Sequence, residues 1–113
     1  MYKLTLLFRH PPDLMKFEHD WAETFVAFAE KMPGILRIAV STIDGGPTGP
    51  AEYHKIHEYY FANRAAMDKA MHSEKGVRAG NVLQVIAPGL YTLLFSEVAE
   101  DYVRDEGRPP EAP

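Results

Sequence analysis

The chain has 113 residues, 46% hydrophobic and 25% charged, so we expect one folded domain with a modest core. It has no cysteine, which excludes disulfides, thiolate metal sites and cysteine nucleophiles. Its formal net charge is −4 without a basic stripe, which argues against nucleic acid as a partner. No apolar run is long enough to span a membrane and the start does not resemble a signal peptide, so we expect a cytoplasmic protein without membrane contact.

The first part of the chain predicts a strand, a helix and a second strand. Residues 2–9 alternate between apolar and polar side chains, as in a half-buried strand. Asp13 is a candidate N-cap of a helix that Pro33 and Gly34 end. The apolar side chains of this helix recur at steps of three and four: Leu14, Phe17, Trp21, Phe25, Phe28 and Met32. Residues 35–43 are rich in branched apolar side chains and predict the second strand.

The second part predicts two more strands and further helix. A glycine- and proline-rich loop at residues 44–50 leads to a third strand at 53–61. Asn63 and Ser73 are candidate caps, the first for a short helix and the second for a helical stretch through about residue 86. A fourth strand is expected at residues 90–98.

The order of these elements, βαββαβ, predicts an α+β, ferredoxin-like sandwich. We expect one domain at residues 1–98, followed by an acidic, proline-rich tail at 99–113. Such a tail would not order by itself, so we expect it to contact a partner subunit.

Both predicted helical regions cover one face of the sheet, and the other face is too apolar to remain bare. It must carry Leu7, Ala39 and Leu94, together with either Ile56 and Tyr60 or at least two of Tyr53, His57 and Tyr59. Apolar surface of this extent marks an interface. We therefore expect a twofold homodimer that packs sheet against sheet.

The third predicted strand carries most of the side chains that could do chemistry. Alternation places His54, Ile56, Glu58 and Tyr60 on one face and Tyr53, Lys55, His57 and Tyr59 on the other. A glutamate held against apolar groups has its pKa raised by desolvation and becomes a usable general acid or base, which makes Glu58 a candidate. The alternative is an ion pair of Glu58 with Arg9, Arg37 or Lys55 across the sheet.

The first predicted helix offers candidate ligand contacts. Glu18 falls toward its apolar side, where it either looks into a cavity or snorkels to solvent. Trp21 and Phe25 form either the aromatic wall of a pocket or plain core. His19 and Glu23 have the spacing of metal ligands but lie on the polar face, so no metal site is expected. Phosphate-binding, dinucleotide-binding, zinc-protease and serine-hydrolase motifs are absent, so we expect catalysis without a cofactor.

Seven segments together resemble the EthD family of dimeric α+β barrel proteins: residues 1–11, Phe17, 21–24, 33–37, 45–47, 53–61 and 93–97. The resemblance spans residues 1 to about 98. It implies a ferredoxin-like monomer, a dimer built from two packed sheets, and a small-molecule pocket between sheet and helices in each subunit. Glu58 matches a position that is commonly acidic in the family.

The resemblance also implies a class of function. EthD proteins are associated with ether degradation by a cytochrome P450 system. The wider superfamily includes polyketide cyclases and decarboxylases, muconolactone isomerases and cofactor-free monooxygenases, which all handle small apolar or aromatic molecules. Many EthD members carry a histidine where this chain has Phe25, so activity that depends on that histidine should be absent here.

Three hypotheses follow. The first is a small cofactor-independent isomerase, decarboxylase or cyclase with Glu58 or His54 as acid–base group, and His10 and Tyr60 as hydrogen-bonding partners. In this hypothesis Glu58 faces Trp21 and Phe25 and has a raised pKa. The second is a non-catalytic module that binds a small apolar molecule or supports an oxygenase. The third is haem ligated through His54 or His57.

Overall fold

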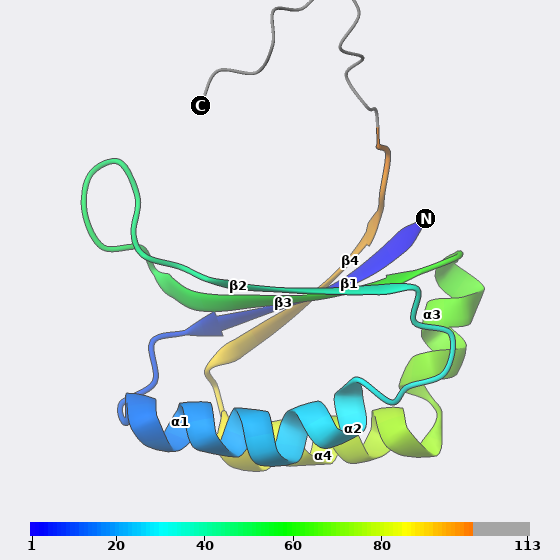
Figure 1. Cartoon of the computed structure of the whole chain (residues 1–113), viewed down its shortest axis with the longest axis horizontal. Coiled ribbons are helices and arrows are strands. Elements are labelled where there is room, and N and C mark those ends of the chain that lie inside the picture. Colours follow the sequence, from blue (N-terminus) through cyan, green and yellow to red (C-terminus); the bar gives the residue numbers. More distant parts are fainter. Residues whose placement is uncertain (101–113) are drawn as a thin grey trace, which may run out of the picture.

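A four-stranded antiparallel sheet with helices on one face makes up the fold in the computed structural model, which describes residues 1–100 (Figure 1). The strands lie in the order β2-β3-β1-β4. Their bounds are Tyr2–Arg9 for β1, Arg37–Thr42 for β2, Tyr53–Phe61 for β3 and Tyr91–Glu97 for β4. The predicted ferredoxin-like α+β fold is confirmed. The expected contact of the tail with a partner falls on residues 101–113, outside the described part of the chain.

The helical layer has two antiparallel parts. The first is a continuous run of α1 (Leu14–Asp20), the π-helix η1 (Trp21–Phe25) and α2 (Val26–Ala29). The second consists of α3 (Arg64–Met71) and α4 (Glu74–Ile86), and α4 lies beside the first run beneath the sheet (Figure 1).

All three predicted N-caps are formed. The side chain of Asp13 accepts from the Lys16 N–H, that of Asn63 from the Ala66 N–H, and that of Ser73 from the Gly76 N–H. Each cap satisfies a backbone donor that the first helical turn leaves without a partner.

The first helical run ends earlier than predicted, at Ala29 instead of Met32. The N–H groups of Lys31 and Met32 bond to carbonyls three residues back, so the chain tightens and leaves the α-helical pattern. Gly34 follows with φ +83°, a conformation that favours glycine. The second strand consequently begins at Arg37 instead of residue 35.

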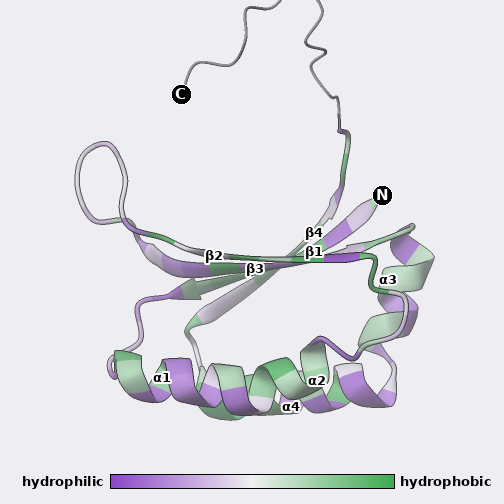
Figure 2. Ribbon diagram, in the orientation of Figure 1, coloured by the Kyte–Doolittle hydropathy of each residue, from purple (hydrophilic) through white to green (hydrophobic). Residues whose placement is uncertain are grey.

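The core lies between the sheet and the helices. Leu4, Leu6 and Phe8 point from β1 toward the helices and are buried. The Phe8 ring meets the edges of Phe17 and Phe25, with centroids 5.1 and 6.5 Å apart. Hydrophobic and hydrophilic residues alternate around the helices, as this packing requires (Figure 2).

The junction between α3 and α4 depends on Gly76. A Cβ at this position would lie 2.2 Å from the Ala70 carbonyl oxygen and 2.7 Å from that of Met71. Both atoms belong to backbone that a side-chain rotation cannot move. Only glycine therefore allows α3 and α4 to approach this closely.

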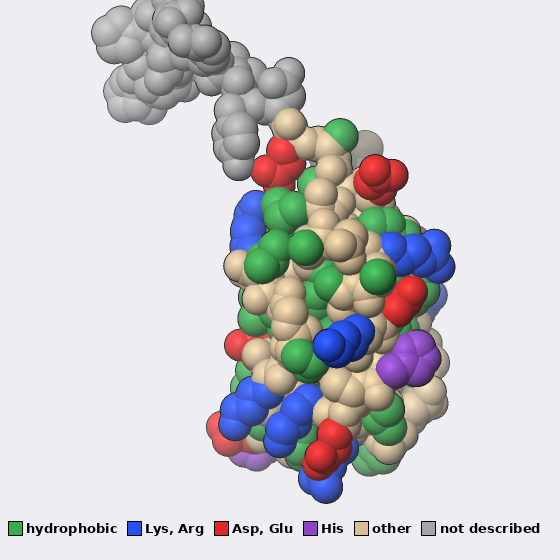
Figure 3. All heavy atoms as spheres, turned by 90° about the vertical axis from the view of Figure 1, so that its right-hand side faces the viewer, with side chains coloured by type: hydrophobic (Ala, Val, Ile, Leu, Met, Phe, Trp, Pro, Cys, Tyr) green, Lys and Arg blue, Asp and Glu red, His purple; other side chains and the backbone are tan. Residues whose placement is uncertain are grey.

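The helix-free face of the sheet has an apolar part. The strand register places Leu7, Ala39, Ile56, Tyr60 and Leu94 on this face, which is one of the two sets that the sequence allowed. Leu94 is 47% exposed. The α3 end of the molecule, by contrast, mixes charged and apolar side chains (Figure 3). No helix within residues 1–100 is long and apolar enough to cross a membrane.

Candidate active site between η1 and β3

The pairing of β1 with β3 decides which side chains of β3 face the helices. Phe8 pairs with Lys55, Leu6 with His57 and Leu4 with Tyr59. Because paired residues point to the same side of a sheet, Lys55, His57 and Tyr59 face the helical layer. All three are buried.

The predicted orientation of Glu58 and Tyr60 is wrong. Both lie on the helix-free face, since Glu58 pairs with Thr5 and Ala39. A carboxylate oxygen of Glu58 lies 2.8 Å from Lys3 Nζ, and this hydrogen bond raises the pKa of Lys3. The guanidinium of Arg37 lies 4.5 Å from the centre of the Tyr60 ring. Glu58 is thus ion-paired, but with Lys3 rather than with the cations that the sequence suggested.

His54 reaches the helical side although it belongs to the other alternation set. The β1–β3 register shifts between Phe8 and Arg9, so one residue of β3 is extra there. The His54 ring meets the edge of Phe17 with centroids 6.0 Å apart, and its Nε2 lies 3.5 Å from Glu18 Oε1. The His10 ring is 6.0 Å from that of His54, and His10 Nε2 lies 2.7 Å from the Ala51 carbonyl oxygen.

A buried ion pair joins the first helix to β3. Lys55, only 3% exposed, places Nζ 2.6 Å from Glu18 Oε2 and 3.5 Å from the centre of the Trp21 ring. Glu18 remains 38% exposed, so one end of the pair reaches solvent. The apolar-side position of Glu18 therefore serves the pairing of a buried lysine, and the Trp21 ring adds a cation–π contact.

The polar side chains between the first helix and β3 form one cluster: Glu18, Trp21, Glu30, His54, Lys55, His57 and Tyr59. His57 is the most enclosed of them, with no exposed surface. Its ring packs against Trp21 and Phe25, with centroids 5.4 and 6.1 Å away. Its Nδ1 lies 3.1 Å from the Tyr59 hydroxyl, and its Nε2 is 3.5 Å from Glu30 Oε2. Burial, helped by the positive charge of Lys55, lowers the pKa of His57 to about 4, so the imidazole is neutral at pH 7.

Tyr59 is held as a neutral phenol by the same surroundings. Burial, and then the negative charge of Glu30, raises the pKa of Tyr59. The hydrogen bond between His57 and Tyr59 therefore joins two neutral groups.

Three buried side-chain atoms within residues 1–100 have no hydrogen-bond partner: Trp21 Nε1, His54 Nε2 and His57 Nε2. All three belong to this cluster. A buried polar atom without a partner is costly and requires an explanation. Their concentration in one place is the main sign that the cluster is a binding site.

An apolar cavity of about 70 Å³ adjoins the cluster. Phe25 and Tyr59 line it on the side of His57, and Leu4, Ala29, Met71 and Leu83 are among its other walls. This volume holds roughly two water molecules and is well below the ~300 Å³ of a typical ligand pocket. A metabolite therefore needs side chains such as Phe25 to move aside.

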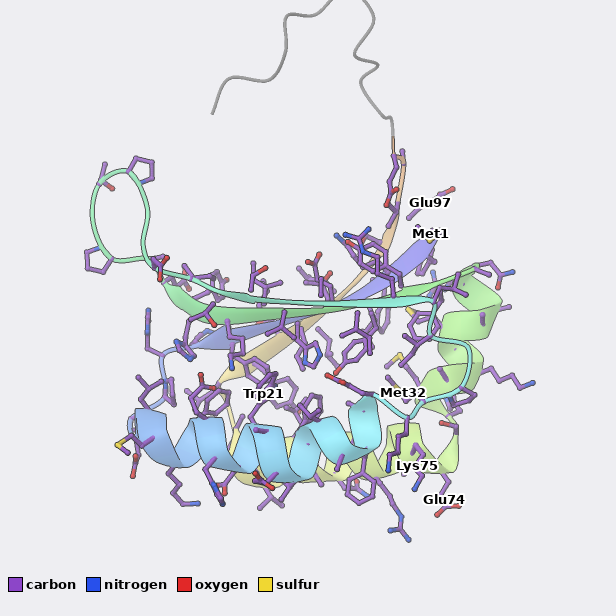
Figure 4. The ribbon with its side chains drawn as sticks, in the orientation of Figure 1. Met1, Trp21, Met32, Glu74, Lys75 and Glu97 are labelled. Atoms are coloured by element: carbon purple, nitrogen blue, oxygen red, sulfur yellow. The ribbon has the colours of Figure 1, made fainter. Side chains whose placement is uncertain are left out.

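The helix beneath the cluster is irregular. The Val26 N–H bonds to the Trp21 carbonyl, five residues back, and the Thr24 hydroxyl donates to the Asp20 carbonyl. A threonine bond of this kind competes with the regular helical ladder. Single π-turns are frequent at functional sites. Trp21 extends from this turn toward the sheet (Figure 4).

Of the residues singled out in the sequence, Glu18, Trp21, Phe25 and His54 lie between the first helix and β3. His10 is exposed, and its ring lies 6.0 Å from that of His54. Lys55, Tyr59 and Glu30 were not named as site residues, and His57 was named only as a candidate haem ligand. The signal in the sequence was Phe61. This apolar residue shares the alternation set of His57 and Tyr59, which indicates that this set faces the core, and Phe61 is fully buried in the structure. No group of three or more histidine or carboxylate side chains in residues 1–100 is placed to hold a metal ion.

Comparison with known proteins supports the resemblance. A relative from Rhodococcus erythropolis, an uncharacterised 11.0 kDa protein of the thcB-thcC intergenic region, is 26% identical over 97 residues, which are 86% of this chain and 94% of the relative. The structure of an ethyl tert-butyl ether D (EthD) family protein from Bacillus halodurans is 27% identical, has a TM-score of 0.85, and matches 88% of this chain and 99% of its own. The chain is similar to EthD-family proteins. No family model matches it.

Two more distant structures share the EthD-like fold. A dimeric ferredoxin-like protein of unknown function from Jannaschia is 16% identical with a TM-score of 0.63, over 87% of this chain and all of its own. SnoaB, a cofactor-independent oxygenase from Streptomyces nogalater, is 12% identical with a TM-score of 0.62, over 88% and 93%. In the present chain, Phe25 stands where the resemblance to the EthD family implies a histidine. The Phe25 ring packs against His57.

Proposed function

We propose that this protein is a small enzyme that moves a proton on a small, largely apolar or aromatic metabolite without a cofactor, in the manner of an isomerase, decarboxylase or cyclase. The observation that carries the proposal is His57: it is fully buried, neutral, held by Tyr59 at one nitrogen and without a partner at the other. A neutral imidazole in an apolar site is a suitable hydrogen-bonding acid toward a substrate oxygen.

His54 is the second proton-transfer group of the proposal. Its Nε2 is buried without a hydrogen-bond partner and lies 3.5 Å from the Glu18 carboxylate. Two titratable groups in different surroundings suit the roles of acid and base. Glu58 and Tyr60, on the other face of the sheet, have no role in this proposal.

Turnover in deuterium oxide tests the proposal directly. A panel of small aromatic and alicyclic metabolites is incubated with the protein, and deuterium uptake is followed by mass spectrometry. We expect uptake into at least one compound, a loss of at least about 100-fold in His57→Gln and His54→Gln, and unchanged uptake in Glu58→Gln. Loss of uptake in Glu58→Gln alone would overturn the assignment of the site.

A second candidate function is non-catalytic binding of an apolar molecule. The almost wholly apolar lining of the cavity, with Phe25 in place of a histidine, favours it. Compounds that bind but never gain deuterium, in the wild-type protein as in the variants, would support this function instead.

We also propose that the protein is a homodimer through the helix-free face of the sheet. Leu7, Ile56 and Leu94 present apolar surface there that no described helix covers. The ferredoxin-like neighbour from Jannaschia is itself dimeric, which supports a dimer.

A further inference from the structure

The hydrogen-bonding capacity of the cluster specifies the chemistry of its ligand. The indole Nε1–H of Trp21 can only donate. His57 can donate or accept at Nε2, depending on which of its nitrogens carries the proton. The Tyr59 hydroxyl decides between these two states.

Tyr59 is buried, and its hydroxyl lies 3.1 Å from His57 Nδ1. If Nδ1 carried the proton, the imidazole would donate to Tyr59 and the hydroxyl hydrogen would be buried without an acceptor. If Nδ1 is bare, the hydroxyl donates to it and its hydrogen is satisfied. The second arrangement is favoured, and it places the proton of the neutral imidazole on Nε2.

Both Trp21 Nε1 and His57 Nε2 are then buried donors, and both lack an acceptor. The two rings pack against each other with centroids 5.4 Å apart, so both donors belong to one part of the molecule. Glu30 Oε2, at 3.5 Å from His57 Nε2, is farther than the 2.7–2.9 Å of a charge-assisted hydrogen bond. An acceptor supplied by a ligand would complete the site.

The charges nearby disfavour an anionic ligand. The ammonium of Lys55 is already paired with Glu18 at 2.6 Å, and Glu30 adds a negative charge near His57. A carboxylate ligand would lie beside the carboxylates of Glu18 and Glu30, and Lys55 is already paired. Removing the charge of such a ligand from water would therefore be costly.

We propose that the site binds a neutral aromatic or alicyclic carbonyl compound, whose oxygen accepts hydrogen bonds from Trp21 Nε1–H and His57 Nε2–H. This inference rests on the proposed small-molecule function and specifies its substrate class. It makes Trp21 a specificity-determining residue, because its donor discriminates between a carbonyl and a plain hydrocarbon.

Three probes of similar size test the inference: acetophenone, a neutral ketone; ethylbenzene, which has no acceptor; and benzoate, an anion. Trp21 is the only tryptophan, so its indole N–H gives a single resonance that reports from inside the site. We expect acetophenone to shift this resonance downfield saturably and to bind at least about tenfold more tightly than ethylbenzene or benzoate. We expect Trp21→Phe to weaken acetophenone about tenfold, measured by calorimetry, and to leave ethylbenzene unchanged.

The outcomes separate the two proposals. Equal or tighter binding of ethylbenzene or benzoate would overturn the carbonyl preference and leave small-molecule binding intact. If none of the probes perturbs Trp21, both proposals fail for this site. The tautomer is tested without any ligand, by long-range proton–nitrogen spectra of His57. A proton on Nδ1 instead of Nε2 would overturn the inference even if Trp21→Phe does not fold.

Discussion

The Tyr59 hydroxyl and His57 Nδ1 lie 3.1 Å apart on the helix-facing side of β3, two residues apart in the chain. The contact joins two buried neutral groups, and the other ring nitrogen of His57, Nε2, is buried without a hydrogen-bond partner. The protonation state of this pair therefore connects the stability of the fold with the chemistry of the site.

His57 should make the protein less stable in acid. Its pKa is about 4 in the folded protein and 6.5 when exposed. Between these two pH values His57 is protonated in the unfolded chain but stays neutral in the folded protein. The free energy of unfolding should fall by about 3 kcal/mol between pH 6.5 and 4 from this group. Lys55, Tyr59 and Glu30 are the titratable groups around it.

Urea denaturation of His57→Gln against pH measures this contribution as a difference from the wild type. The variant should show a shallower decline between pH 6.5 and 4, and His19→Gln, which changes an exposed histidine, should follow the wild type. Parallel curves for wild type and His57→Gln would contradict the assignment.

The Glu18–Lys55 pair should be coupled more strongly than a surface pair. Glu18→Gln leaves a buried ammonium without its counterion and should lower the free energy of unfolding by about 2 kcal/mol. Lys55→Met keeps the apolar stem of the side chain and should lower it by less. The double variant should resemble Lys55→Met, giving a coupling energy of about 1–2 kcal/mol.

The exposed pair Arg64–Asp68 on α3 is the matched control, and its coupling should stay below about 0.5 kcal/mol. Equal coupling energies for the two pairs would show that Lys55 is solvated in solution.

Replacing each of two glycines of α4 by alanine should change the stability of the protein in opposite directions. Gly76→Ala forces a Cβ against the Ala70 carbonyl and should destabilise the protein by at least about 1–3 kcal/mol. At Gly80 nothing lies within 4 Å of the added Cβ, so Gly80→Ala should stabilise the helix by up to about 1 kcal/mol. Thermal unfolding of both variants checks the pair, and a tolerated Gly76→Ala would mean that α3 and α4 are farther apart.

Leu94→Asp should dissociate the proposed homodimer. The substitution places a charge in the apolar part of the helix-free face, where a standard interface cannot tolerate it unpaired. Sedimentation velocity at micromolar concentration should show a dimer for the wild type and a monomer for the variant. Val85→Asp, at a 79% exposed position of α4, should remain dimeric. A wild-type monomer would remove the proposal.

The sequence by itself determined the elements and their order. Asp13, Asn63 and Ser73 were recognisable as caps because capping depends on bonds to backbone only two or three residues away. The alternation of β1 identified Leu4, Leu6 and Phe8 as one face because strand periodicity is a local property. The candidate residues on the first helix followed in the same way from helical spacing.

Only the tertiary structure decided which face of β3 lines the site. Alternation divides His57 and Tyr59 from Glu58 and Tyr60, but it is symmetric with respect to the two faces, and a shift of one residue in pairing exchanges them. The pairing of Leu6 with His57 broke that symmetry. The bulge beside Arg9 then returned His54 to the helical side, because an extra residue in one strand reverses the alternation beyond it.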